Sequence, residues 1–304
     1  MLITKTAISI LQTTFSMLYG AAWSETPNWY QNIATVIPSS TKTNTYGWMQ
    51  RILQMREWVG PRLFQNLNTH SFVVENKDWE LTVKVPRNDF ADDNLGIWSP
   101  LMSEMGRQGK KLPDILVQGA LQAGSAAASL GFDGLPFFSA LHTLNPAGVQ
   151  SNLFTAATSG ATPLVAGAGV GLDKVRQAMI SYTGEDGLPM GVYPNLLIVP
   201  PQLEFAAKTI LFAERAANGS TNIQKGDMNY IVIPELANAP TEWFVADTTK
   251  SIKPLIYQLR EAVKMTSLTN VDDANVFFHK EFVWGQDGRA VASYGPWFLM
   301  AKAI

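Results

Sequence analysis

A segment with the period of an α-helix separates two segments with the period of β-strands, and this order most restricts the possible folds. From Leu95 to about Leu130, apolar residues recur every three or four positions, which predicts a long helix with one apolar face. Pro113 lies inside this segment and is expected to kink or divide the helix, because proline has no amide donor. Strand-like alternation precedes this segment and returns after Lys253. The succession predicts an α+β fold.

The strand-like segments contain two predicted β-hairpins. In the first, apolar residues alternate with polar ones over 79–85, and residues 72–74 are expected to pair with them across a turn at 75–78. In the second, the turn is expected in the stretch GQDG, at 285–288, because Asp-Gly is a strong hairpin signal. An isolated ribbon of two strands has little core of its own and needs a neighbour for stability.

Further elements are predicted on both sides of the long helix. Residues 1–23 predict an amphipathic helix, whereas residues 24–45 are rich in Ser, Thr, Asn and Pro and predict an extended arm rather than a packed element. Residues 131–171 are rich in Gly, Ala and Pro and are expected to be irregular. A second lobe is predicted to contain a helix, a strand followed by a helix, and two short strands, at 172–182, 195–211, 230–236 and 242–247.

The composition argues against several classes of function. The chain has 304 residues and a formal net charge of −2, whereas a dedicated nucleic-acid binder is usually basic. It has no cysteine, so thiolate metal sites and thiol nucleophiles are excluded, and a reducing cytoplasm fits this composition. No apolar run approaches the roughly 18 residues that span a bilayer, so no membrane association is expected. Only 16% of the residues are charged and nine are tryptophan, which suggests a surface partly covered by partners.

The stretch RNDFADDNLGIW, at residues 87–98, is the strongest candidate for chemistry. An EF-hand register that starts at Asp89 or at Asp92 places unsuitable residue types at the ligand positions, so a calcium loop is not supported. Asp92 and Asp93 are neighbours in sequence, and such side chains point apart on a helix or a strand. Asp and Asn directly before a long helix instead bind its free amides and meet the positive end of its dipole. We therefore predict that Asp92, Asp93 and Asn94 cap the long helix.

Other enzyme signatures are incomplete. The stretch GRQGKK lacks the glycine spacing and the Ser or Thr of a P-loop, and no Gly-x-Ser-x-Gly motif is present. Of the three histidines, His142 is the one candidate for a site residue, and an ordinary packed or loop histidine is the alternative. An Asp/His-dependent hydrolase would have to use Asp92 or Asp93 with His142. The sequence thus predicts no catalytic, cofactor-binding or metal site, and no cofactor.

Several motifs that occur in one order resemble the Mu-like phage major head subunits. They are NTYGW at 44–48, REWVG at 56–60, DFADDNLGIW at 89–98 followed by EMGR at 104–107, and EFVWG with RAVASYGPW within 281–297. The resemblance covers roughly residues 1–110 and 240–304, and no motif matches at about 130–180. It implies the Hong Kong 97-like major capsid fold. In that fold we expect an N-terminal arm at 1–45, an extended loop (a β-hairpin) at 46–86, a peripheral domain with a long spine helix at 87–130 and 241–304, and an axial domain at 131–240.

The resemblance also implies a structural function rather than an enzymatic one. Copies of the chain would assemble into the pentamers and hexamers of an icosahedral shell that encloses double-stranded DNA, first in the host bacterial cytoplasm and then as part of the virion. The implied partners are other copies of the chain, a scaffolding protein, a portal and a decoration protein, with DNA held by non-specific contacts only. An encapsulin-like compartment shell is the alternative within the same fold class, and the hydrolase is the alternative of a different class.

Aromatic and arginine side chains near the predicted ribbon are candidates for contacts between subunits. A ring needs heterologous contacts, in which one face of a subunit meets a different face of the next. A ribbon could find on a neighbour the packing partner that it lacks in its own chain, and Trp and Arg are enriched at interface anchors. Packing within the chain's own core is the alternative for each residue. The candidates are Trp48, Arg51, Arg56, Trp58, Arg62 and Trp79.

Overall fold

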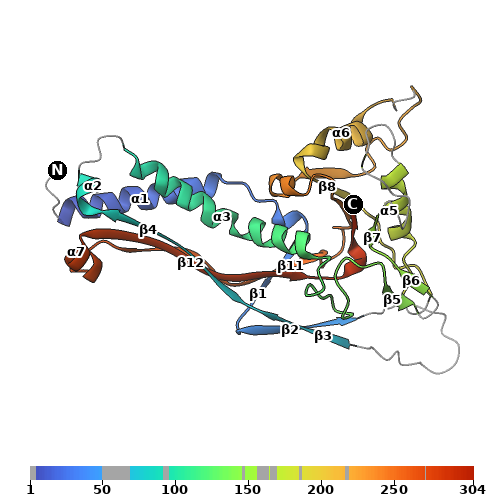
Figure 1. The fold of residues 1–304 in the computed structure, drawn as a ribbon, viewed down its shortest axis with the longest axis horizontal. Coiled ribbons are helices and arrows are strands. Elements are labelled where there is room, and N and C mark those ends of the chain that lie inside the picture. The colour runs from blue at the N-terminus through green and yellow to red at the C-terminus, as the bar shows by residue number, and fades with distance from the viewer. Residues whose placement is uncertain are drawn as a thin grey trace.

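Strands and helices alternate along an elongated molecule, which has a long sheet under two long helices at one end and a smaller sheet with shorter helices at the other (Figure 1). This arrangement confirms the predicted α+β class. The computed structural model describes residues 5–49, 69–91, 96–145, 148–155, 164, 170–184, 187–215, 219–270 and 272–304.

A four-stranded sheet forms the long half of the molecule, in the order β1–β11–β12–β4. β11 runs antiparallel to β12, β12 runs antiparallel to β4, and the short β1 lies parallel to β11 on the other edge. The strands are β1 (Ala34–Pro38), β4 (Lys77–Pro86), β11 (Leu255–Leu268) and β12 (Glu281–Tyr294). The short helices α2 (Arg87–Ala91) and α7 (Ala274–His279) lie at its far end.

Two long helices, α1 (Lys5–Glu25) and α3 (Trp98–Ala123), pack together on this sheet (Figure 1). The N-terminal helix predicted from the sequence is therefore confirmed. The helices approach closely at Gly106, where a Cβ atom would lie 2.5 Å from the backbone oxygen of Tyr19. A small core forms beneath them from Phe15, Val85, Met102, Met105, Val276, Phe282 and Trp284.

Helix α3 continues through Pro113, so the expected division of the helix is wrong. Met102 and Met105 are buried before the proline, and Val117 and Leu121 are buried after it. Because both halves are fixed by packing, the helix continues despite the hydrogen bond that the proline cannot make.

The predicted unpacked arm is also partly wrong, because Ile33 is fully buried and β1 belongs to the long sheet. The buried Asp114 of α3 organises the turn before β1. Its Oδ1 accepts hydrogen bonds from the amides of Trp29 (3.1 Å) and Tyr30 (2.9 Å), and its Oδ2 accepts one from Asn28 Nδ2 (3.0 Å). Burial raises the pKa of Asp114, and these hydrogen bonds oppose the rise. The buried carboxyl group of Asp114 thus adds to the β1–β11 pairing that joins the arm to the body.

The first predicted hairpin is wrong. β3 (Thr69–Glu75) pairs with β2 (Thr43–Met49) in a separate two-stranded ribbon, whereas β4 pairs with β12. The residue between β3 and β4, Asn76, is buried and donates its amide to Lys42 O at 3.0 Å. Tertiary partners on two different sheets therefore override the local preference of 75–78 for a turn.

The second predicted hairpin is wrong as well, because β12 runs without a turn through 285–288. Neither glycine of this stretch has the positive φ of a tight turn. A Cβ atom at Gly288 would lie 2.9 Å from Val263 Cγ2, so glycine serves close packing against β11. The segment just before β12 forms the short helix α7, which includes Phe278.

The second half of the molecule contains a five-stranded sheet in the order β7–β13–β10–β8–β9. Its strands are β7 (Leu153–Phe154), β8 (Leu196–Val199), β9 (Asn229–Val232), β10 (Trp243–Ala246) and β13 (Met300–Ala303). The nearby helices are α5 (Val170–Ile180) and α6 (Glu204–Phe212), and β5 (His142–Asn145) pairs with β6 (Gly148–Gln150). The short 3-10 helices are Tyr30–Asn32, Pro201–Leu203, Pro234–Asn238 and Trp297–Leu299. The helices and strands predicted for this lobe are confirmed.

A single large core joins the two halves. It contains Ile256 and Tyr257 of the long sheet together with Trp243, Phe244 and Trp297 of the smaller half. The chain passes directly from β12 of one sheet to β13 of the other through a single 3-10 turn. The two sheets therefore share the apolar interior that fixes their relative position.

Candidate functional site

The structure describes only some of the residues that were predicted to contact other subunits or to cap the long helix. Trp48 lies in β2 opposite His70, with no side chain described, and Trp79 is described in full. Outside the described residues lie Arg51, Arg56, Trp58 and Arg62, and likewise Asp92, Asp93 and Asn94. Their proposed contacts and the capping of α3, which begins at Trp98, stay predictions.

Trp79 lies at the start of β4, which is an edge strand of the long sheet. Its indole Nε1 donates a hydrogen bond to Ala290 O at 2.9 Å, and the side chain is half-buried. Trp79 is therefore held partly by its own chain and still presents a surface to the outside. Its contact with another subunit stays a prediction.

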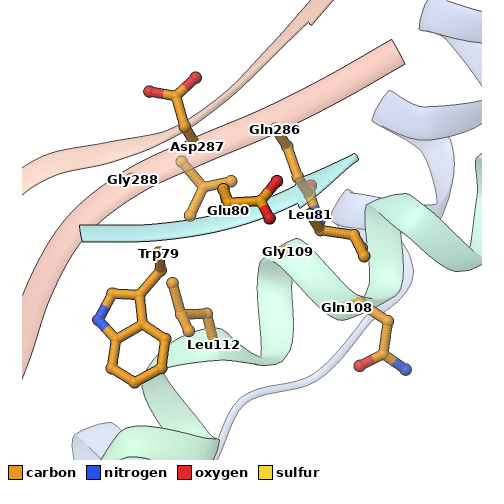
Figure 2. Close-up of a pocket in the computed structure, with 10 residues that line it drawn as sticks. Trp79, Glu80, Leu81, Gln108, Gly109, Leu112, Gln286, Asp287 and Gly288 are labelled. Carbon is orange, nitrogen blue, oxygen red and sulfur yellow. The ribbon is translucent and has the colours of Figure 1, made fainter. Parts of the chain in front are cut away.

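A pocket of about 360 Å³ opens beside Trp79, between β4 and α3 (Figure 2). Trp79 and Leu81 of β4 face Leu112 of α3 across it, while exposed Glu80 and Asp287 add negative charge. The full lining is Trp79, Glu80, Leu81, Gln108, Gly109, Leu112, Val263, Gln286, Asp287 and Gly288. Apolar side chains such as these can accept an apolar side chain of another molecule.

Large apolar side chains are exposed on two helices at opposite ends of the molecule (Figure 1). On α7, Phe277 and Phe278 are each 74% exposed, and their rings pack edge to face with centroids 5.1 Å apart. On α6, Phe205 and Phe212 are exposed and lie seven residues apart, hence on one face of the helix. Exposed aromatic side chains of this kind mark surfaces that contact partners. The sequence reasoning missed both pairs, although the spacing on α6 was a usable signal.

His142 is buried within the smaller half, which contradicts its reading as a site residue. Its Nδ1 lies 2.5 Å from Asp133 Oδ2, its Nε2 lies 3.1 Å from Asn152 Oδ1, and its ring stacks on Trp297 at 4.1 Å. Asn152 in turn donates to three backbone oxygens, those of Phe137, Trp297 and Met300. With its ring fully covered, His142 connects packed segments and cannot reach a substrate.

Neither a metal centre nor a membrane segment is found in the part of the chain that the structure describes. Within it, no group of three or more His, Asp or Glu side chains could hold a metal ion. No described helix is both long enough and apolar enough to cross a membrane. The most conspicuous features of the described residues are thus the exposed apolar surfaces, the edge strand β4 and the ribbon of β2 and β3.

Comparison with known proteins connects these features with one class of protein. The model of the family described as the Mu-like prophage major head subunit gpT matches residues 8–165, 169–236 and 235–303. The chain is 28% identical over 304 residues to the major capsid protein of Escherichia phage Mu, which covers 100% of this chain and 75% of that protein.

Solved phage capsids give the same result at the level of structure. The chain is similar to the procapsid of bacteriophage JBD30, with 31% identity, a TM-score of 0.58, and coverage of 99% of this chain and 75% of that chain. It is also similar to the JBD30 capsid decorated with minor capsid protein trimers, with 30% identity and a TM-score of 0.60, over 69% of this chain and 91% of that chain. These likenesses confirm the capsid fold that the sequence motifs implied.

The comparisons also decide between the alternative functions. The relatives are structural capsid proteins, which argues against the Asp/His-dependent hydrolase. The family match and the phage relatives favour a phage head over an encapsulin-like compartment. Taken with a family match along nearly all of the sequence, they show that the chain belongs to the Mu-like prophage major head subunit gpT family.

Proposed function

We propose that copies of this major capsid protein assemble as pentamers and hexamers into an icosahedral shell that encloses double-stranded DNA. The observation that carries this proposal is the pair of exposed aromatic surfaces on α6 and α7, at opposite ends of an elongated subunit. A ring closes through contacts between two different faces, and neighbouring rings need a further contact far from the ring axis. A subunit with separate adhesive surfaces at its two ends meets both needs.

The proposed division of the subunit follows its two sheets. The N-terminal arm comprises residues 1–45, the axial domain residues 131–240, and the peripheral domain residues 87–130 and 241–304. Because β4 pairs with β12, we assign residues 77–86 to the peripheral domain as well. The extended loop then reduces from 46–86 to the part built on the β2–β3 ribbon.

Each surface has a proposed contact. The Phe205 and Phe212 face of α6, in the axial domain, contacts the next copy within a ring. The Phe277 and Phe278 pair on α7, at the far end of the peripheral domain, contacts a copy in an adjacent ring. Both contacts bury aromatic area that water otherwise covers, at about 25 cal/mol per Å² of apolar surface. A shell multiplies such modest contacts, so no single one has to be strong.

Further partners are proposed for the assembled shell. A scaffolding protein and a portal are expected during assembly, and a decoration protein on the finished shell. The JBD30 capsid, to which this chain is similar, is decorated with trimers of a minor capsid protein. Packaged DNA is held by non-specific contacts only, since the formal net charge of −2 offers no excess of cations for the phosphates. As a major capsid protein, the chain is a component of the virion.

Negative-stain electron microscopy of the purified protein, with light scattering on the same sample, tests the proposal. Closed polyhedral shells, or rings of five and six subunits, would support it. A monodisperse monomer that never assembles, even with the scaffolding protein of its phage, would contradict it.

Matched variants separate the two contacts. Phe278→Ser should leave isolated rings that fail to join into shells, whereas Phe205→Ser should reduce ring formation itself. Lys280→Ala, an exposed change next to α7, is the control and should assemble as the wild type does. If Phe278→Ser and Lys280→Ala assemble equally well, α7 is not a contact between rings.

A further inference from the structure

A buried polar cluster lies where the β2–β3 ribbon joins the body of the subunit. At its centre is Asn76, the single residue between β3 and β4. The Asn76 side-chain amide donates to Ser39 Oγ at 3.0 Å and to Thr41 O at 2.9 Å, and its backbone amide donates to Lys42 O at 3.0 Å. One residue therefore fastens the end of β3 to the segment that enters β2.

The cluster continues into the long sheet through Gln258 of β11, whose side chain is fully buried. Its Nε2 donates to Asn76 Oδ1 at 2.8 Å, and its Oε1 accepts a hydrogen bond from the Tyr46 hydroxyl at 2.6 Å. Burial raises the pKa of Tyr46, so this hydroxyl stays protonated and able to donate. The ribbon, the junction and the sheet are thus connected by an unbroken chain of hydrogen bonds from Tyr46 through Gln258 and Asn76 to Ser39.

Apolar packing at the base of the ribbon does not define the direction of the ribbon as these hydrogen bonds do. Tyr46 and Phe72 lie opposite each other on the inner face of the ribbon and pack against the main core. Such contacts are non-directional and tolerate sliding. Hydrogen bonds require a donor to point at its acceptor, so a buried network with all its members paired selects one arrangement. On the other face of the ribbon, Thr45 and Val73 lie opposite each other and are exposed.

We infer that Asn76 is a positioning residue that sets the direction in which the β2–β3 ribbon leaves the subunit, and thereby the copy that the ribbon reaches. The inference rests on the proposed function, the assembly of copies into a shell, and on the sequence-based expectation that the ribbon finds a packing partner on a neighbouring subunit. Asn76 itself contacts no partner in this account. It acts through Gln258 and the Ser39 segment, which hold the two strands of the ribbon at their base.

The test measures the direction of the ribbon in unassembled subunits. The chain has no cysteine, so spin labels can be attached at Val73→Cys on the ribbon and Ile115→Cys on α3, both exposed positions, without background. Electron–electron double resonance should give one narrow distance distribution in the otherwise wild-type chain. Asn76→Ala should replace it with a broad distribution, and its assembly products should become heterogeneous in size.

Two further variants keep the test decisive. Lys42→Ala, which removes an exposed ion pair with Glu75 at the same end of the ribbon, is the control and should keep the narrow distribution. Tyr46→Phe removes only the hydroxyl that donates to Gln258, so it tests the network if Asn76→Ala does not fold; it should also broaden the distribution. An unchanged distribution in folded Asn76→Ala, or in Tyr46→Phe where that variant replaces it, overturns the inference. A broadened distribution with normal assembly supports the positioning role but contradicts the proposed contact of the loop with a neighbour.

Discussion

Gly106→Ala should destabilise the subunit by forcing α1 away from α3. The new Cβ atom would lie 2.5 Å from Tyr19 O and 3.3 Å from Tyr19 Cα, and these backbone atoms cannot rotate away. Relieving such an overlap costs about 1–3 kcal/mol. Alanine favours a helix over glycine by roughly 0.5–1 kcal/mol, so the steric cost exceeds the gain in propensity in most of this range. Denaturant unfolding of unassembled subunits, followed by circular dichroism, measures the difference.

Gly119→Ala in the same helix provides the matched control. Gly119 is exposed, and no atom lies within 4 Å of the position that its Cβ would take. This substitution should therefore stabilise the chain by about 0.5–1 kcal/mol. Subtracting the change in unfolding free energy of Gly119→Ala from that of Gly106→Ala cancels the contribution of helix propensity. What remains is the steric cost at Gly106. Equal changes in the free energy of unfolding for both variants would refute the idea that Gly106 sets the approach of the two helices.

Three further predictions test other parts of the chain. Trp58→Ala should leave a folded subunit that assembles poorly in light scattering; loss of the fold would instead assign Trp58 to the core. His142→Ala should lower the free energy of unfolding by about 3 kcal/mol, because it removes a buried ring and its hydrogen bond to the buried Asn152, and circular dichroism melting would detect this. Burial raises the pKa of Asp114 in the folded chain, so protonation of this carboxyl group stabilises the fold. This stabilisation is complete below the unfolded pKa of about 3.9 and is lost as pH rises through the higher folded pKa. The melting temperature of the wild type relative to Asp114→Asn should therefore increase as pH falls from neutral toward 4, and a constant difference would contradict the assigned burial effect.

The periodic spacing of apolar residues was sufficient to predict the elements that bury one face or one continuous run of residues. The helix α3 and the strands β8 and β10 of the smaller sheet were predicted because their apolar spacing reflects a single buried face or a wholly buried run. The family resemblance then supplied the arrangement of these elements, which spacing does not encode. The predicted division at Pro113 was wrong because the sequence does not show that buried residues on both sides hold the helix.

Both hairpin predictions failed for the same physical reason. A turn signal such as Asp287-Gly288 describes what the backbone favours locally, whereas β12 has hydrogen-bonded partners along both edges. The many ladder bonds of a central strand outweigh one local preference. Similarly, the stretch around Asn76 has turn-forming residues, but its amide groups are used to join two sheets. Sequence spacing cannot reveal partners that lie about two hundred residues away, as β12 does from β4.

The candidate contact surfaces depend on which side chains are exposed, and residue type alone does not give this information. Tryptophan and arginine were chosen by residue type, which selected Trp79, whose side chain is partly used within the chain. The exposed Phe277 and Phe278 were overlooked because phenylalanine in a strand-rich segment suggests burial. Exposure depends on what surrounds a residue, and that information comes only with the packed structure.

The shared core also limits where this subunit can adapt to different neighbours. If the shell contains both pentamers and hexamers, identical chains must meet at more than one angle. A hinge between the two sheets would have to separate fully buried residues such as Trp243 and Ile256, at about 25 cal/mol per Å² of apolar area exposed. The ribbon base is held by a few hydrogen bonds, each contributing about 0.5–1.5 kcal/mol net, and by the packing of the partly buried Tyr46 and Phe72 against the core. Rotation of the ribbon therefore costs far less than rotation of the sheets, so the Asn76 network sets a preferred direction that a neighbour can still alter.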